Sequence, residues 1–317
     1  MPGATAGLAA SDQLAPAEQL NSLTQCPLDM GKVPLKGLIN VKSRILTGLI
    51  GSAVALIVLL LLPPLALNIA MSIICAMAMY EVFVVTKLVS HRGLETVAVL
   101  FALTAPFLNR MRSLAAVMVI LGFLIALAVI QVRYHSQLPV EKTGLVFMIS
   151  VLISVSFSCL VYLRETTLRG DDRDGLFYVF LGLAIPWLCD IGAYFVGTFL
   201  GRHKLCPTIS PKKTVEGLVG GICISVGSGL LAGYLYQVLA LGDSASVNLW
   251  QIGLLSLLCA PLSVLGDLFA SVIKRQSGAK DFGHIMPGHG GIMDRFDSMM
   301  FVLPVIYIAI RFFPLVY

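Results

Sequence analysis

The sequence predicts an all-α integral membrane protein with about nine transmembrane helices and a cytoplasmic N-terminus. Hydrophobic residues make up 57% of the chain and charged residues only 12%, whereas a soluble domain carries roughly 25% charged residues. Stretches of about 20 apolar residues recur, which is the length that a helix needs to cross a hydrocarbon core roughly 30 Å thick. The alternating pattern of an outer-membrane β-barrel is absent.

The predicted spans leave a polar tail at the N-terminus. Residues 1–43 form this tail, which lacks the basic start and short apolar run of a cleavable signal peptide. Pro63-Pro64 separates the first two spans as a tight outer turn. N-terminal transmembrane helices then occupy 44–175, and a C-terminal transmembrane region occupies 176–317. The nine spans are 45–62, 65–86, 93–109, 113–132, 144–163, 175–200, 216–241, 249–273 and 296–316.

Lysine and arginine set the predicted orientation. With the N-terminus inside, 16 of the 22 Lys and Arg residues fall in the tail and inner loops, and five fall in outer loops. Because positive charge is enriched in cytoplasmic loops, we expect the two most basic loops, 201–216 and 274–295, to face the cytoplasm. The net charge of +5, segregated in this way, indicates phosphate-bearing partners or membrane orientation, and no nucleic-acid partner is expected.

An aspartate lies inside the sixth predicted span. Asp190, Tyr194, Gly197 and Gly201 are spaced to fall on one helical face. An acid at that depth costs at least about 2.5 kcal/mol, so it usually faces a polar cavity or a partner. The glycines let a helix or a ligand approach closely. Helix packing around one internally paired acid is the alternative interpretation.

The first inner loop ends in a candidate phosphate cradle. Ser210 is a good helix N-cap, and the following proline suits the first helical position. A helix start at Ser210 would direct free N–H groups toward an anion, with Lys212 and Lys213 beside them and Thr214 following. Alternatively, the two lysines only mark the membrane interface.

The second inner loop carries more chemistry. Asp267, Ser271, Lys274 and Arg275 fall on one face near the inner end of a span, and Lys280 follows. An acid, a hydroxyl and several bases are therefore expected to share one space. Elsewhere, Glu81 and Glu216 are ambiguous, since each could line a polar cavity or pair with a base.

The same loop ends in glycines and acids. His289 precedes two glycines, which allow close backbone approach, and Asp294, Arg295 and Asp297 are expected to open the last helix. Mg²⁺ is typically bound by one or two carboxylates plus phosphate oxygens, and Asp267 could supply a further carboxylate. Bases would neutralise the remaining phosphate charge. No Walker A, HExxH or paired-cysteine motif occurs.

The segment from Ser271 to Asp297 resembles the signature of the phosphatidate cytidylyltransferase family, also called CDP-diacylglycerol synthases. Met286 is the one departure, because the pattern prefers Leu, Ile or Phe there. The stretch upstream is similar to the family too, so the resemblance covers roughly 186–300 in detail. The matching positions are Ser271, Lys274-Arg275, Lys280-Asp281, Gly283, Pro287, His289-Gly290-Gly291, Asp294-Arg295 and Asp297.

The resemblance implies a bacterial-type inner-membrane enzyme that joins CTP to phosphatidate on its cytoplasmic side, with Mg²⁺ as cofactor and room for a second cation. It implies that the lipid phosphate attacks the α-phosphorus of CTP and expels pyrophosphate, and that the enzyme is a homodimer. Asp267, Asp294 and Asp297 are the implied metal ligands. The implied catalytic residues are Asp267, Asp294, Lys274, Arg275 and Lys280. The implied substrate-binding residues are Ser210, Lys212, Lys213, Thr214, Ser271, His289, Arg295 and Asp190.

Two other functions remain open from the sequence. A cytidylyltransferase for another lipid phosphate would carry the same signature, because the signature concerns phosphates and metal rather than acyl chains. An ion-coupled transporter would explain Asp190 and Asp267 as intramembrane acids. It would give no reason for glycine- and lysine-rich loops on one face.

Overall fold

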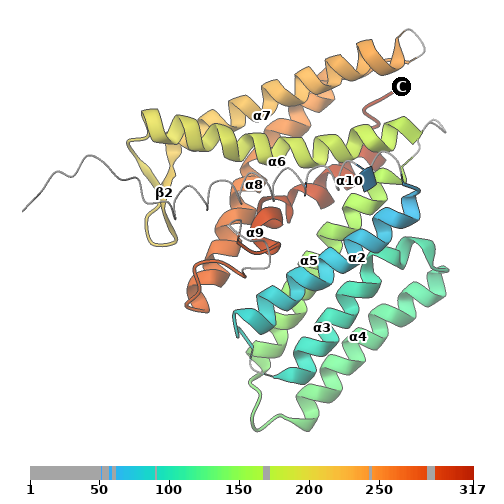
Figure 1. Cartoon of the computed structure of the whole chain (residues 1–317), viewed down its shortest axis with the longest axis vertical. Helices are drawn as coiled ribbons and strands as arrows, with labels where there is room; N and C mark the ends of the chain where they lie inside the picture. Colours follow the sequence, from blue (N-terminus) through green and yellow to red (C-terminus); the bar gives the residue numbers. More distant parts are fainter. Residues whose placement is uncertain are drawn as a thin grey trace, which may run out of the picture. The chain divides into compact units, whose positions relative to one another are not determined.

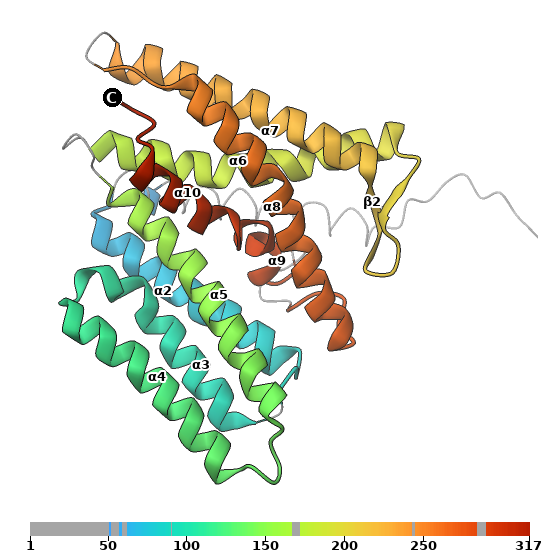
Figure 2. The same ribbon diagram turned by 180° about the vertical axis from the view of Figure 1, so that it is seen from behind.

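The computed structural model describes residues 51, 57–58, 62–89, 91–166, 172–242, 245–283 and 290–317. All of them belong to one unit, Ser43–Tyr317. The predicted tail lies outside the described residues, as does almost all of the first predicted span. Helices dominate the described part of the chain (Figures 1 and 2), which confirms the predicted helical class apart from two short strands.

The N-terminal group consists of α2 (Pro64–Tyr80), the π-helical turn η1 (Glu81–Val85), α3 (Arg92–Thr104), the 3-10 turn η2 (Ala105–Arg110), α4 (Ser113–Arg133) and α5 (Val140–Arg164). These helices lie side by side in Figure 1. Buried Asn68 of α2 donates a hydrogen bond to the Pro106 carbonyl of η2 at 2.9 Å, and Phe101 of α3 stacks on Phe123 of α4. This hydrogen bond avoids the cost of leaving the buried amide nitrogen of Asn68 without an acceptor.

The C-terminal group consists of α6 (Asp172–Leu200), strands β1 (Lys204–Cys206) and β2 (Ser210–Thr214), α7 (Val215–Tyr236), the π-helical turn η3 (Gln237–Leu241), α8 (Leu249–Gln276), α9 (Met293–Phe296), the 3-10 turn η4 (Asp297–Met299) and α10 (Val302–Phe312). α6 and α7 run side by side (Figures 1 and 2). A Cβ on Gly217 would lie only 2.7 Å from the Ala193 carbonyl oxygen, so a small residue there permits the close packing of the two helices.

The predicted helix start at Ser210 is wrong. Residues Ser210–Thr214 form β2, which pairs antiparallel with β1, and α7 begins only at Val215. Thr214 is the true N-cap, because its hydroxyl accepts the Gly217 N–H at 3.1 Å. Pairing with β1 gives the β2 backbone the partners that a helix would otherwise supply, and a proline is tolerated in such an edge strand.

Six helices in the described part of the chain are long and apolar enough to cross a membrane, so the chain is a membrane protein. They correspond to the predicted spans at 65–86, 113–132, 144–163, 175–200, 216–241 and 249–273. The predicted span 93–109 is divided between α3 and η2. The nine-span count and the orientation stay predictions.

The last predicted span, 296–316, also differs in detail. We expected Asp294 and Asp297 to open one continuous helix, but they do not. They lie in the short α9 and in η4, ahead of α10. The C-terminal residues then pair with the segment before α8, through a bridge between Val247 and Val316. Asp294 and Asp297 thus lie in the short α9–η4 segment ahead of α10, and η4 packs against α8.

Candidate functional site

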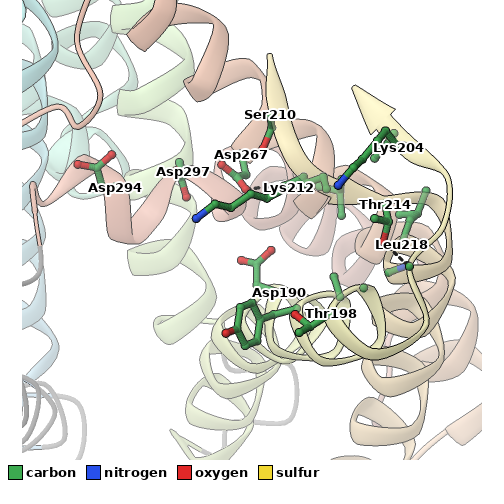
Figure 3. Close-up of a pocket in the computed structure, with 18 of the residues that line it drawn as sticks. Asp190, Thr198, Lys204, Ser210, Lys212, Thr214, Leu218, Asp267, Asp294 and Asp297 are labelled. Atoms are coloured by element: carbon green, nitrogen blue, oxygen red, sulfur yellow. Dashed lines mark hydrogen bonds and ion pairs between the residues drawn. The ribbon is translucent and has the colours of Figure 1, made fainter. Parts of the chain in front are cut away.

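One cavity of about 770 Å³ collects most of the predicted site residues. Its walls come from α6, the β1–β2 hairpin, the start of α7, α8 and the α9–η4 turn (Figure 3). Five acids and five bases line it: Asp190, Asp267, Asp281, Asp294 and Asp297, with Lys204, Lys212, Lys213, Lys274 and Arg295. The volume lies within the range of about 300–1,000 Å³ that is usual for small-molecule sites.

The wall formed by α6 confirms the predicted face. Asp190, Tyr194, Gly197 and Gly201 all line the cavity. Figure 3 shows the Asp190 side chain directed toward the space that Asp267 borders from α8. A polar cavity therefore explains the position of Asp190 within an apolar helix, the first of the two interpretations that the sequence allowed.

On α8, the predicted shared face holds only in part. Asp267 forms an ion pair with Lys213 of β2, with Nζ and Oδ2 2.6 Å apart, although the angles are not those of a hydrogen bond. Ser271 is buried below Asp267 and donates to its Oδ1 at 3.4 Å, so it supports the carboxylate rather than lining the cavity. Arg275 is exposed and directed to the Ala279 carbonyl. At 100° per residue it lies about 80° around the helix from Asp267.

Asp294 is held by three donors. Its Oδ1 accepts from Lys274 Nζ at 2.8 Å, and its Oδ2 accepts from the backbone N–H groups of Phe282 at 3.0 Å and Gly291 at 3.1 Å. Lys274 Nζ also lies 3.7 Å from Asp297 Oδ2. The Lys274 and Asp294 side chains are only 10% and 7% exposed. An ion pair at this depth requires such additional hydrogen bonds to offset its desolvation.

The β1–β2 hairpin contributes lysines and hydroxyl groups to the cavity. Ser210, Lys212, Lys213 and Thr214 all line the cavity, from a strand rather than from a helix terminus. The hairpin ends are held by Glu216 of α7, whose carboxylate accepts the Arg202 N–H at 3.0 Å. The predicted lysines therefore line the cavity from a strand instead of a helix start, and their role in binding phosphate stays a prediction.

Three predicted residues lie away from the cavity, and one lies outside the described residues. Arg275 and Lys280 are exposed, and Ser271 is buried beneath Asp267. His289 lies outside the described residues. Lys204 and Asp281 line the cavity but were not among the predicted site residues. Both lie in the two charged loops, and Asp281 is also one of the positions that match the family signature.

The donor set fits a divalent cation that is shared with phosphate. Among the described residues, no group of three or more His, Cys, Asp or Glu side chains is arranged to hold a metal by itself. Lys213 and Lys274 contact the carboxylates of Asp267 and Asp294. Mg²⁺ needs only one or two carboxylates when phosphate oxygens complete its shell. Hard oxygen donors of that kind line this cavity.

The fold and the cavity indicate a class of protein, namely a helical membrane protein with a site for polyphosphate chemistry. The cavity combines carboxylates with ammonium groups, as such chemistry requires. Residues 42–313 match the sequence model described as the cytidylyltransferase family. The chain belongs to this family and is therefore a nucleotidyltransferase.

Several curated relatives carry one name. The phosphatidate cytidylyltransferase of Bacillus subtilis strain 168 is 32% identical over 288 residues, which cover 87% of this chain and 100% of that protein. The protein of the same name from Staphylococcus saprophyticus is 42% identical over 150 residues, covering 47% of this chain and 53% of that protein. That from Staphylococcus aureus strain COL is 44% identical over 137 residues, covering 43% and 50%.

Proposed function

We propose that this chain is a phosphatidate cytidylyltransferase, which converts CTP and phosphatidate into CDP-diacylglycerol and pyrophosphate. The single observation that carries the proposal is the cavity in which the lysines of the β1–β2 hairpin meet the aspartates of α8 and the α9–η4 turn. Family membership and the names of the relatives support it. The position of each residue in the cavity supports the role proposed for it below.

The reaction is a direct displacement at phosphorus. A phosphate oxygen of phosphatidate forms a bond to the α-phosphorus of CTP, and the bond from that phosphorus to the bridging oxygen of the β-phosphate breaks. Pyrophosphate leaves with the electron pair, so no covalent enzyme intermediate is needed. Catalysis in this class is mostly positioning and charge stabilisation.

The bases of the cavity separate two substrates that repel each other. Lys204 and Lys212 are exposed at its hairpin wall, where they can bind the triphosphate of CTP. Lys213 and Lys274 lie deeper, each paired with a carboxylate. Both ammonium groups can donate to phosphate oxygens, and charge-assisted hydrogen bonds of this kind are about twice as strong as neutral ones.

Asp267 and Asp294 would hold Mg²⁺, with Asp297 as close support. The cation, when bound, neutralises phosphate charge and orients the α-phosphorus for attack. The same carboxylates are held in place by the chain itself: Asp267 by Ser271 and Asp294 by two backbone N–H groups. Preorganised ligands of this kind avoid reorganisation during the reaction.

A turnover assay tests the function. Purified protein is incubated with labelled CTP and a panel of lipid phosphates that includes phosphatidate. Label in CDP-diacylglycerol, with release of pyrophosphate, is expected. Preference for a different lipid phosphate would replace the substrate but keep the chemistry, and transport without nucleotide turnover would contradict the proposal.

The cytoplasmic orientation of the cavity is also part of the proposal. Lys280 is exposed and directly precedes Asp281, which lines the cavity. A cysteine introduced there by Lys280→Cys, in a background without other accessible thiols, should react only with reagents that reach the cytoplasm. Labelling from the outer side would contradict both the orientation and access to cytoplasmic CTP. The homodimer stays a prediction from the family resemblance.

A further inference from the structure

A buried carboxylate from the N-terminal helices contacts the loop next to Asp294. Glu81 opens η1 directly after α2 and is fully buried. Its Oε2 accepts a hydrogen bond from the Met293 backbone N–H at 2.9 Å, between residues 212 positions apart. Burying an acid within an apolar membrane helix costs free energy. The hydrogen bond between Glu81 and the Met293 N–H therefore indicates that Glu81 has a specific role in this loop.

Two glycines of the same loop lie against this carboxylate. A Cβ on Gly283 would lie 2.7 Å from Glu81 Oε1, and a Cβ on Gly291 would lie 2.6 Å from Glu81 Oε2. Both distances are too short for a real Cβ, so these positions accept only glycine while Glu81 keeps its place. A Cβ on Gly291 would also lie 2.9 Å from the Gly283 nitrogen, which shows that the two glycines are close to each other.

The Asp294 carboxylate binds the same stretches of backbone. It accepts the N–H groups of Phe282, the chain neighbour of Gly283, and of Gly291, which itself lies against Glu81. Met293, the donor to Glu81, directly precedes Asp294. Glu81 thus contacts the backbone directly before Asp294, through the Met293 N–H. It also contacts Gly283 and Gly291, in the stretches of backbone that bind the Asp294 side chain.

We propose that Glu81 is a positioning residue for Asp294, acting through the Met293 N–H and the contact with Gly283 and Gly291. The N-terminal helices then contribute to the site without lining its cavity, since Glu81 comes from η1 and is absent from the cavity wall. The effect on turnover rests on the proposed function, whereas the effect on the loop does not.

Hydrogen exchange tests the positioning directly. Glu81→Ala removes the acceptor, Glu81→Gln keeps a side-chain oxygen for the Met293 N–H, and Asn68→Ala is the control. Asn68 is buried in α2, which directly precedes η1, but is bonded to Pro106 instead. We expect amide exchange in 281–283 and 290–294 to accelerate about tenfold in Glu81→Ala, to recover in Glu81→Gln and to be unchanged in Asn68→Ala.

Turnover on the same preparations gives the second measurement. Glu81→Ala should lower kcat about tenfold or more, and Glu81→Gln should restore most of it. Unchanged exchange in the loop, or acceleration that extends equally to α7, would overturn the positioning role. If the loop responds as expected but the wild-type protein does not use CTP, the positioning stands and the proposed function fails.

A double substitution isolates the contact with glycine. The three atoms nearest to a Cβ on Gly283 all belong to Glu81. Gly283→Ala alone should therefore lower turnover, and adding it to Glu81→Ala should cause no further loss, because the obstructing carboxylate is gone. Losses that multiply would show that the two residues act independently and would overturn the proposed contact.

Discussion

Replacing Asp294 by asparagine separates the structural role of this carboxylate from its proposed catalytic role. Asp294 accepts from Lys274 Nζ at 2.8 Å, from the Phe282 N–H at 3.0 Å and from the Gly291 N–H at 3.1 Å. An asparagine amide has a single oxygen. Whichever way it turns, its own N–H groups face at least one of these donors.

The size of the effect follows from these contacts. A hydrogen bond to a charged group contributes about 1.5–3 kcal/mol, and among the described residues the nearest remaining counter-charge to Lys274 would be Asp297, at 3.7 Å. We expect Asp294→Asn to lower the free energy of unfolding by about 2–3 kcal/mol. Turnover should fall about 100-fold or more, as when one preorganised charge-stabilising group is removed.

The double substitution Lys274→Met with Asp294→Asn distinguishes the two roles. Neutralising both members of a buried pair is often harmless to stability, so this variant should recover most of the lost thermal stability without recovering turnover. Thermal unfolding in detergent and turnover of labelled CTP are measured on the same preparations. Turnover of Asp294→Asn within about threefold of wild type would refute the catalytic role, and an unchanged unfolding temperature would refute the structural one.

Other substitutions test the hairpin and the opposite end of α6. Lys213→Ala should raise the KM for CTP about tenfold, with exposed Lys142→Ala as control; unchanged kinetics would limit Lys213 to an interface role. Glu216→Ala, which frees the hairpin backbone, should raise the same KM about threefold, and an unchanged KM would show that the hairpin holds without it. Tyr236→Phe removes the 2.7 Å hydrogen bond to Asp174 and should lower stability by about 1–2 kcal/mol; a changed KM would contradict its separation from the cavity.

Local patterns predicted the membrane helices well. The predicted spans 113–132, 175–200 and 249–273 agree within a few residues with α4, α6 and α8. Length and hydrophobicity determine such helices almost alone, because each must satisfy its own backbone in lipid. The span 93–109 deviates since Pro106 cannot continue the hydrogen bonding of α3, and the chain tightens into η2 instead.

The hairpin shows where local patterns were insufficient. Ser210 followed by proline fits a helix start, but Thr214 fits one as well, and the choice depends on whether another strand is available for pairing. β1 supplies that strand from across the turn. Arg275 shows a different limit: a common helical face was assigned across about 80°, whereas of its four residues only Asp267 and Lys274 line the cavity.

Glu81 could be singled out from the sequence but not assigned. Its burial cost marks it as unusual, yet its contact with Met293 spans 212 positions, beyond the reach of any motif. The signature loop contains its own lysine and acids, but the backbone that carries Asp294 is held partly by a helix far earlier in the chain. A Cβ on Gly283 or Gly291, both part of that loop, would clash with this distant carboxylate in its observed position. The loop therefore needs the N-terminal helices, so a fragment restricted to 176–317 should retain the cavity lysines but lose the ordered position of Asp294.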